Sequence, residues 1–280
     1  MRLGTIGIGA VLVFCAWLPL PGARAEQAVM TPVDEVEKQN FAWRNGLKET
    51  YFGNREIAED DVIVLEAPMR AEDSARVPLQ IKARIPQTEA RYIKTISLVI
   101  DANPAPLAGR FRFTPKSGRA DLSLRVRVND YTMVRAIAET NDGALHMSAQ
   151  YVKAAGGCSA PVGTDLDAAM ARLGKIKLKT RDPTADEPTT ATLNISHPNI
   201  TGLQMDQLTH LYVPPHFVKE VRVSFDHEPI FVAETDIAIS EDPSFGFDFV
   251  ADRDGELVTE VIDSKGMKFS DTHPVKAVHY

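Results

Sequence analysis

A single cysteine stands between two β-rich parts of the chain. Cys158 follows Gly156 and Gly157 and is followed by the small residues Ser159 and Ala160. The two glycines give the backbone wide conformational freedom, and no bulky side chain flanks the thiol. We therefore expect Cys158 to lie on a flexible arm that presents it outward. Because the thiolate is the reacting form of cysteine, the chemistry expected here is that of an exposed thiol.

The other cysteine, Cys15, lies in a segment typical of a secretory signal. Residues 1–25 have a basic start at Arg2, an apolar run over residues 6–20 and the sequence Ala-Arg-Ala before Glu26. This pattern predicts a signal peptide cleaved after residue 25 and a periplasmic location, and the run is too short for a comfortable membrane span. No second hydrophobic stretch follows. Since exported folds use structural cysteines in pairs, Cys158 is expected to be a free thiol or an intermolecular link.

Nothing near Cys158 in the sequence activates it strongly. The nearest cation along the chain is Lys153, and Arg125 and Arg127 alternate with apolar residues, which predicts that they line the solvent face of a strand. Activation of the thiol is then expected to come from outside this segment of the chain.

Composition excludes several classes of function. The 280 residues are 44% hydrophobic and 25% charged, with a net charge of −7 and a pI near 5.5, so the chain is globular, long enough for two domains, and unsuited to charge-driven nucleic-acid binding. There is no haem-attachment motif, phosphate loop, dinucleotide fingerprint or hydrolase motif. We therefore expect no cofactor and no autonomous catalysis.

Other polar residues favour ordinary structural roles. The spacing of His197, His210 and His216 matches no zinc motif, so no metal site is expected. Pairs of carboxylates such as Asp60-Asp61 and Glu241-Asp242 lie in turn-like contexts, and solvated loops are expected there.

A helix is predicted at the start of the mature chain and strands after it. The helix covers residues 26–45, is broken by Gly46 and Gly53, and is expected to pack on the first sandwich. Alternating apolar residues bounded by turn signals predict two series of strands. The first series is 62–65, 77–81, 92–100, 110–113, 122–128, 131–138 and 144–152, and the second is 176–179, 191–195, 217–225, 229–235, 245–249, 257–262 and 267–269.

Many short strands without intervening helices predict an all-β fold with two immunoglobulin-like sandwiches. The predicted domains are residues 26–155, with the N-terminal helix, and residues 175–275. Between them lies a flexible arm and linker, residues 156–174, with a short helix that Thr164 or Asp165 caps and Gly174 ends.

The two halves resemble the two subunits of the SoxYZ sulfur carrier, fused in one chain. The first half is similar to SoxY in its opening strand pair, its final strands and its Gly-Gly-Cys segment, and the second half is similar to SoxZ. The residues that carry the resemblance are 65–68, 71–78, 134–139, 142–143 and 156–158 for SoxY, and 195–198, 201–202, 213–218, 239–240, 242–243 and 263–266 for SoxZ.

The resemblance implies that the two sandwiches pack together and that Cys158 carries a sulfur intermediate, such as one derived from thiosulfate, between periplasmic redox enzymes. It also implies that His197 and His216 are structural features of the second sandwich. In SoxY the Gly-Gly-Cys-Gly-Gly segment is a free C-terminal tail, whereas Cys158 is internal here. Fused chains of this kind resemble the quinoprotein dehydrogenase-associated SoxYZ-like carriers, which implies c-type cytochromes or a quinoprotein dehydrogenase as partners.

Two alternatives remain open from the sequence. The chain could be an adaptor that binds a quinoprotein dehydrogenase or its cytochrome without covalent cargo, because Cys158 is internal and its trailing glycines are missing. It could also dimerise covalently through Cys158.

Overall fold

The computed structural model describes residues 32–161, 166–206 and 209–278. The predicted signal peptide and the predicted capping residues Thr164 and Asp165 lie outside these ranges. In the part that the structure describes, no helix is long and apolar enough to cross a membrane.

The N-terminal helix ends later than the predicted end at residue 45. Helix α1 (Pro32–Ala42) continues through a π-helical turn (Trp43–Leu47) into α2 (Lys48–Phe52). Gly46 does not break the helix, because it lies within the π-helical turn and the chain stays helical through it. Gly53, with φ of 63°, ends it as expected. The helix packs on the first sandwich, as predicted.

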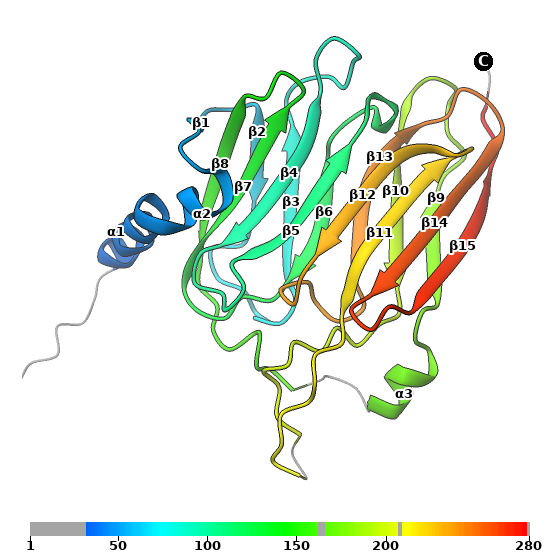
Figure 1. Ribbon diagram of the computed structural model, residues 1–280. Helices are drawn as coiled ribbons and strands as arrows, with labels where there is room; N and C mark the ends of the chain where they lie inside the picture. The colour runs from blue at the N-terminus through cyan, green and yellow to red at the C-terminus, as the bar shows by residue number, and fades with distance from the viewer. Residues whose placement is uncertain (1–31, 162–165, 207–208, 279–280) are drawn as a thin grey trace, which may run out of the picture. The chain divides into compact units, whose positions relative to one another are not determined.

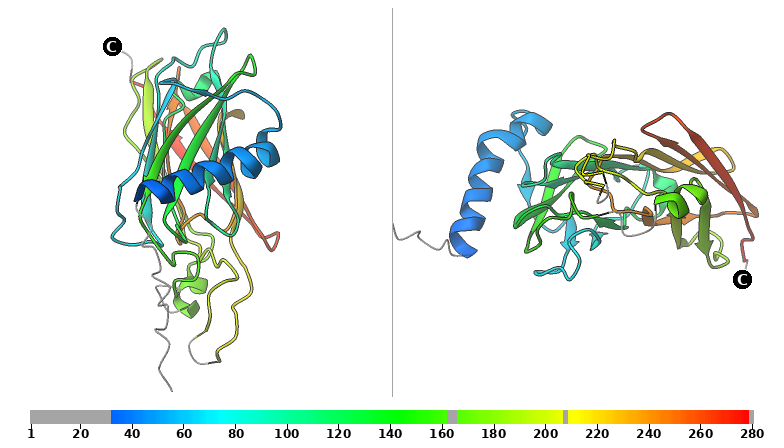
Figure 2. Two further views of the ribbon diagram at one scale, coloured as in Figure 1. Left: turned by 90° about the vertical axis from the view of Figure 1, so that its left-hand side faces the viewer. Right: turned by 90° about the horizontal axis from the view of Figure 1, so that it is seen from below.

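Trp43 anchors this helix. Its buried indole lies in a small apolar cluster with Val99, Ile137, Leu145 and Met147. The guanidinium of Arg135 lies 4.7 Å from the indole centroid and pairs with Asp101, and both charged groups are buried. The first view in Figure 2 shows the helix running across the outside of the strands.

Every strand predicted from the alternating pattern is present. The bounds differ by three residues or fewer, except for the last strand, which continues six residues past the predicted end at residue 269. The first half contains β1 (Ala58–Glu59), β2 (Ile63–Glu66), β3 (Val77–Ala83), β4 (Ile93–Ile100), β5 (Leu107–Phe113), β6 (Leu122–Val126), β7 (Thr132–Thr140) and β8 (Leu145–Val152). The second half contains β9 (Ile176–Thr180), β10 (Pro188–Ile195), β11 (Val218–Phe225), β12 (Glu228–Thr235), β13 (Ser244–Val250), β14 (Gly255–Asp263) and β15 (Lys268–Val275). Only the two-residue β1 has no counterpart in the prediction. A short helix, α3 (Leu166–Ala171), precedes β9.

Each half is a two-layer, immunoglobulin-like sandwich, and the two sandwiches join edge to edge. One sheet has nine strands in the order β1-β8-β7-β4-β5-β12-β11-β14-β15, and the other has six in the order β2-β3-β6-β13-β10-β9. The joins are antiparallel: β5 pairs with β12 over five residue pairs, and β6 pairs with β13 over three. Figure 1 shows both sheets running without a break from the first half to the second. Backbone hydrogen bonds therefore fix the two halves against each other.

One apolar core fills the space between the sheets across this join. Inward-facing residues of both halves belong to one cluster of buried side chains. At its centre Phe231 stacks on Phe247 with ring centroids 4.9 Å apart and lies 6.3 Å from Phe111 of the first half. The sequence suggested a separate core for each domain, but the edges of the sandwiches meet and the cores merge.

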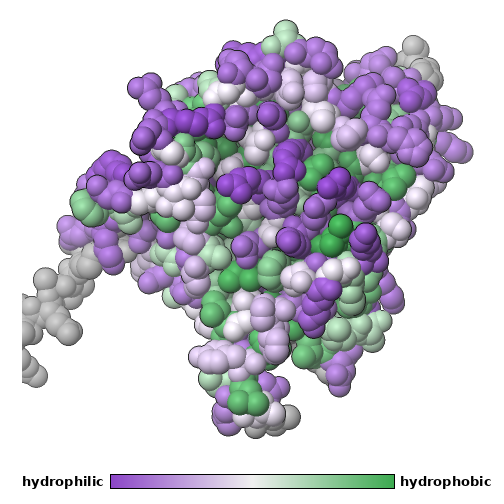
Figure 3. Space-filling model, in the orientation of Figure 1, coloured by the Kyte–Doolittle hydropathy of each residue, from purple (hydrophilic) through white to green (hydrophobic). Residues whose placement is uncertain are grey.

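The outer face of the nine-stranded sheet is polar. Exposed pairs such as Arg112 with Glu234 cross the join. Figure 3 shows hydrophilic side chains over much of this face, with apolar ones between them. Exposed ion pairs of this kind contribute about 0–1 kcal/mol each, so burial of the core stabilises the join far more than they do.

We predict that Phe231→Ala destabilises both halves together. Removing this fully buried ring leaves a cavity in the shared core and should lower the free energy of unfolding by about 3–5 kcal/mol. Urea unfolding followed by far-UV circular dichroism should show one transition at a lower midpoint. Phe41→Ala, on the exposed face of α1, should change stability by less than about 0.5 kcal/mol. Two separate transitions, with only the second shifted, would contradict a shared core.

Candidate functional site

Cys158 lies at the end of the sandwich where the first half passes into the second. A tight turn covers Gly156 to Ser159, closed by the Ser159 N–H donating to the Gly156 carbonyl at 3.2 Å. The side chain of Cys158 is fully buried, with 0% exposure, while Ser159 is exposed. The prediction that the thiol points outward is therefore wrong for this conformation. The turn is docked on the protein and shields the thiol.

The first half holds the turn through its backbone. The Gly156 N–H donates to the Asn129 carbonyl at 2.8 Å, and the Gly157 N–H donates to the Val128 carbonyl at 3.0 Å. The Val128 N–H in turn donates to the Ser74 carbonyl. These bonds attach the turn to the segment that follows β6.

Gly157 has a different role from the predicted one of flexibility. A Cβ atom at this position would lie 2.1 Å from the Ser74 carbonyl oxygen and 2.6 Å from that of Val128. No side chain fits there, so glycine is required for the close approach of two backbones. Gly156 has φ of 77°, a conformation that other residues adopt at a cost, although nothing crowds its position.

The second half holds the turn from the other side. The Thr201 hydroxyl donates to the Cys158 carbonyl at 2.7 Å. Thr201 lies in the long loop between β10 and β11, which projects from the same end of the sandwich as the turn (Figure 1). Both halves of the chain therefore hold the turn that contains Cys158.

Arg127 links the turn to both halves. Its guanidinium donates from Nη1 to the Gly157 carbonyl at 3.3 Å and from Nη2 to the Asn199 carbonyl at 3.4 Å. The residue is 2% exposed, so its predicted place on a solvent face is wrong. β6 ends at Val126, and Arg127 follows it, where the alternation of inward and outward side chains no longer holds.

Burial controls the acidity of the thiol. Loss of solvent raises the pKa of Cys158 from its ordinary value of 9.0 to about 11, and the nearby positive charge of Arg127 opposes this shift. At neutral pH the docked residue is therefore a protonated, unreactive thiol. Both inaccessibility and protonation protect it from oxidation and exchange.

A charged cluster borders the turn. Glu241 was expected in a solvated loop but is buried, and its carboxylate lies 3.3 Å from Arg76 and 3.7 Å from Arg172. Arg172 also forms a close pair with Asp242 at 2.6 Å, which holds the segment after α3 against the loop before β13. The sequence gives no sign of these pairings, because their partners lie far apart along the chain, 70 residues for Arg172 with Asp242 and 165 for Arg76 with Glu241.

His197 and His216 are buried in the second half, as the family resemblance implied, and they lie beside a buried carboxylate. Nε2 of His216 lies 2.7 Å from Asp263, and Nε2 of His197 lies 3.7 Å from the same oxygen. Burial, followed by the neighbouring His216, lowers the pKa of His197 to about 4. His197 is therefore neutral at physiological pH.

The hydrogen bonds of this cluster fit a structural role better than a metal site. The Asn199 N–H donates to Nδ1 of His197 at 3.1 Å, so the proton of the neutral ring lies on Nε2. A histidine that ligates a metal has the opposite arrangement, in which the second nitrogen donates a proton to an acceptor. Asp263 also accepts the N–H groups of Lys265 and Met267, which ties the β14–β15 turn to the cluster.

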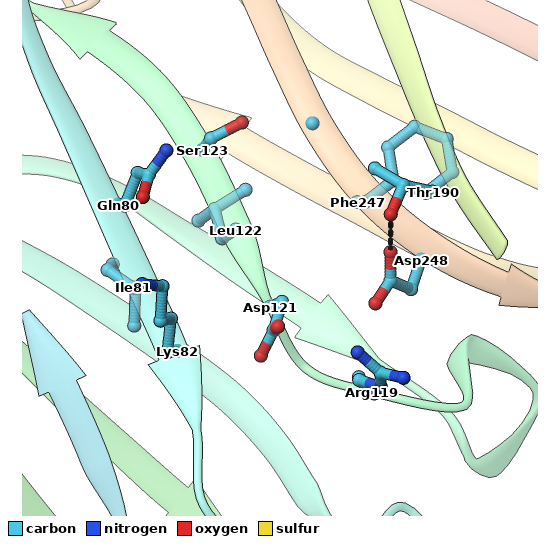
Figure 4. A pocket seen from close by; sticks show the side chains of 11 residues that line it. Gln80, Ile81, Lys82, Arg119, Asp121, Leu122, Ser123, Thr190, Phe247 and Asp248 are labelled. Carbon is cyan, nitrogen blue, oxygen red and sulfur yellow. Dashed lines mark hydrogen bonds between the residues drawn. The ribbon is translucent and has the colours of Figure 1, made fainter. Parts of the chain in front are cut away.

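A separate hollow of about 180 Å³ lies on the outer face of the six-stranded sheet where the halves join. Figure 4 shows Asp248 bonded to Thr190 on one side, with Arg119 and Asp121 below. Burial raises the pKa of Asp248. Neither cysteine nor histidine lines this hollow, and Cys158 does not border it.

We predict that Gly157→Ala releases the turn. The added methyl group must displace the backbone from Ser74, and such overpacking costs about 1–3 kcal/mol. The undocked population, and with it the rate of Cys158 alkylation by iodoacetamide, should rise about tenfold or more. Mass spectrometry gives the rate. Ser159→Ala removes only an exposed hydrogen bond, from the Ser159 hydroxyl to the Gly156 carbonyl at 3.3 Å, and should raise the rate far less than Gly157→Ala does. Equal rates in the two variants would contradict the docking geometry.

The stability that the docked thiol contributes should be lost at alkaline pH. Its pKa is raised in the folded state, so the contribution is complete below pH 9 and falls by about 1.4 kcal/mol per pH unit as the pH rises from 9.0 towards about 11. The difference in unfolding free energy between the wild type and Cys158→Ser isolates this effect from lysine and tyrosine titration. A difference that stays constant across this window would contradict thiol burial.

Two family models match the chain in tandem. Sulfur oxidation protein SoxY matches residues 48–158 and ends on Cys158, and sulphur oxidation protein SoxZ matches residues 176–274. No curated protein matches.

Several solved structures match parts of the chain. The sulfur carrier protein SoxY from Chlorobium limicola f thiosulfatophilum is 24% identical, with a TM-score of 0.35, over 42% of this chain and 96% of that one. A superoxide reductase (neelaredoxin) from Ignicoccus hospitalis is 20% identical, with a TM-score of 0.30, over 33% and 79%. A putative superoxide reductase from Thermotoga maritima is 21% identical, with a TM-score of 0.31, over 36% and 96%.

The order of the two family matches agrees with the two joined sandwiches and with the position of Cys158 between them. The chain belongs to the SoxY and SoxZ families of sulfur oxidation proteins, as a SoxYZ carrier with both modules fused in one polypeptide.

Proposed function

We propose that this protein holds a sulfur-containing intermediate covalently on Cys158 and presents it to partner redox enzymes in the periplasm. The observation that carries the proposal is the position of Cys158. It is the last residue of the SoxY match, and residues of both modules hold its turn. In the described residues it is also the one free cysteine.

The carrier cycle requires two positions of the turn. In the docked position the thiol is buried and protonated, and no reagent reaches it. Release from Arg127 and Thr201 would expose the thiol and return its pKa towards the ordinary value. A partner enzyme would then supply the remaining activation, since the released turn lies beyond the reach of Arg127.

Attachment of a thiosulfate-derived group to Cys158 is a two-electron oxidation and needs an electron acceptor. If thiosulfate is the source, its outer sulfur bonds to the Cys158 sulfur, the thiol proton leaves, and two electrons pass to an acceptor. A c-type cytochrome partner is a suitable acceptor. The product is a disulfide that ends in a sulfonate with one negative charge.

The proposed periplasmic location rests on the sequence of residues 1–25, which has the basic start, apolar run and Ala-Arg-Ala site of a secretory signal.

The proposal that a quinoprotein dehydrogenase is a partner rests on the resemblance of fused chains to the quinoprotein dehydrogenase-associated carriers.

A second candidate function is a non-covalent adaptor for a quinoprotein dehydrogenase or its cytochrome. The observation that favours it is the complete burial of Cys158 in the described conformation. An adaptor would use the sandwich surfaces and would not need the thiol.

The carrier role predicts an adduct in native material. Protein isolated from its own cells, or incubated with thiosulfate and a cognate haem partner, should have an intact mass above that of the mature chain. Cys158→Ser should lack this added mass. A mass shift that persists in Cys158→Ser would contradict attachment at Cys158.

Complementation separates the two candidates. A strain that expresses Cys158→Ser in place of the wild type should lose the function of the carrier. Full function of this variant in vivo, with protein at the wild-type level, would exclude the carrier and support the adaptor.

A further inference from the structure

A cavity lies between the N-terminal helix and the strands that the helix crosses. Its volume is about 530 Å³, which is within the range of roughly 300–1,000 Å³ for small-molecule sites. Residues of the helix form one wall, and residues of β7, β8 and the segment of β1 form the other. These strands are at the end of the nine-stranded sheet farthest from the second half, where Figure 2 shows the helix on the outside of the sandwich. Cys158 does not border this cavity.

Part of the lining is apolar. Met133 of β7 and Met147 of β8 are buried against the outer face of the sheet, next to the buried indole of Trp43. Ile57 adds a half-buried side chain from the segment before β1. Methionine side chains are flexible and polarisable, so they adapt to apolar groups of different shape. This part of the cavity therefore suits the apolar body of a ligand.

Arg135 offers free hydrogen-bond donors to the same cavity. Its side chain is 3% exposed, and Nε donates to Asp101 at 2.9 Å. Nη2 lies 2.8 Å from Asp101 and donates to Oδ1 of Asn40 at 3.0 Å. Nη1 donates to none of the described residues and is not fully buried. Because Arg135 lines the cavity, the two N–H groups of Nη1 are available to a ligand there.

Asn40 and Lys48 add donors from the helix. Since Oδ1 of Asn40 accepts from Arg135, the orientation of the amide is set, and Nδ2 carries two N–H groups. Within the described part of the chain, neither Nδ2 of Asn40 nor the half-buried Lys48 has a hydrogen-bond partner. Both residues line the cavity. Donors from the helix and from β7 therefore lie around one space and have no acceptor.

The charges around the cavity favour an anion. Arg44, Lys48 and Arg135 line it, together with one carboxylate, that of Glu59. Each of the two arginines pairs with a carboxylate outside the lining, whereas Lys48 pairs with no described residue. The exposed carboxylate of Glu59 opposes the charge of Lys48. An anion gains the free donors and the charge of Lys48, and a cation gains only Glu59.

We propose that this cavity binds an amphipathic organic anion, a small molecule with a carboxylate or sulfonate at one end and an apolar body at the other. The anionic group accepts hydrogen bonds from Nη1 of Arg135, Nδ2 of Asn40 and Nζ of Lys48, and such charge-assisted bonds are the strong ones. The apolar body packs on Met133 and Met147. The site is separate from Cys158, and binding at it does not depend on the carrier function.

Calorimetric titration of the full mature chain with matched probes tests this site. Naphthalenesulfonate has both the apolar body and the anionic group. Naphthalenesulfonamide has nearly the same size but no charge at neutral pH, and inorganic sulfate has the charge but no apolar body. Trp43 is the one tryptophan in residues 26–280, so its indole N–H gives a single NMR signal that reports on the lining of the cavity.

Naphthalenesulfonate should bind saturably, with one molecule per chain, and should shift the Trp43 signal. The sulfonamide should bind at least about tenfold more weakly, as expected when hydrogen bonds between charged groups are lost. Sulfate should also bind at least about tenfold more weakly, because it buries no apolar surface.

Three variants separate the local charges from net charge. Lys48→Gln should weaken binding of the sulfonate about tenfold and leave that of the sulfonamide nearly unchanged. Glu59→Gln should strengthen binding of the sulfonate, because it removes the opposing carboxylate. Lys177→Gln makes the same change in net charge as Lys48→Gln, at an exposed position of β9 in the second half, and should leave both affinities unchanged.

Absence of saturable binding of the sulfonate, or equal affinities for the sulfonate and the sulfonamide, would overturn the proposal. A Trp43 signal that stays in place while the sulfonate binds would also overturn it, because the probe would then occupy another surface. Equal losses in Lys48→Gln and Lys177→Gln would do the same, since affinity would then follow net charge alone.

Discussion

The pairing of β5 with β12 and of β6 with β13 is the constraint on which the rest of the structure depends. It continues both sheets across the two modules and merges their cores around Phe231. Because the modules are fixed in this way, the loop that contains Thr201 and the segment that contains Arg127 meet at one end of the sandwich. Cys158 is held between them.

Cys158 is buried in a docked turn, and fusion of the two modules restrains that turn on both sides. A free tail moves without covalent restraint on its far side, whereas here the chain continues from Cys158 into α3 and β9. The docked turn keeps the thiol protonated and out of solvent. Release of the turn requires the breaking of the backbone bonds from Gly156 and Gly157, the long bond from Arg127 to the Gly157 carbonyl and the short bond from Thr201. Such bonds contribute about 0.5–1.5 kcal/mol each, so release requires no unfolding of the sandwich.

The sequence predicts the strands well, because alternating side chains on a half-buried surface report directly on local structure. It also identifies Cys158 by elimination and the two modules by resemblance. It does not predict the site's geometry, since the contacts join distant segments. The prediction that Arg127 faces solvent is wrong because the alternation of inward and outward side chains stops where β6 ends. The prediction of flexibility at Gly157 is wrong because glycine is favoured both where a backbone is flexible and where two backbones approach closely. The prediction that Glu241 lies in a solvated loop is wrong because a turn-like sequence does not show that Arg76 and Arg172 pair with it.

The central claim is that a docked turn shields the Cys158 thiol until it is released. The most direct measurement is the rate of Cys158 alkylation in the native mature protein relative to the same protein in urea, at one pH below 9. A shift of the thiol pKa from 9.0 to about 11 alone reduces the thiolate by about a hundredfold. The native rate should therefore be at least about a hundredfold slower than the rate in urea. A native rate within a few-fold of the rate in urea would show that the thiol is exposed, and would contradict the account.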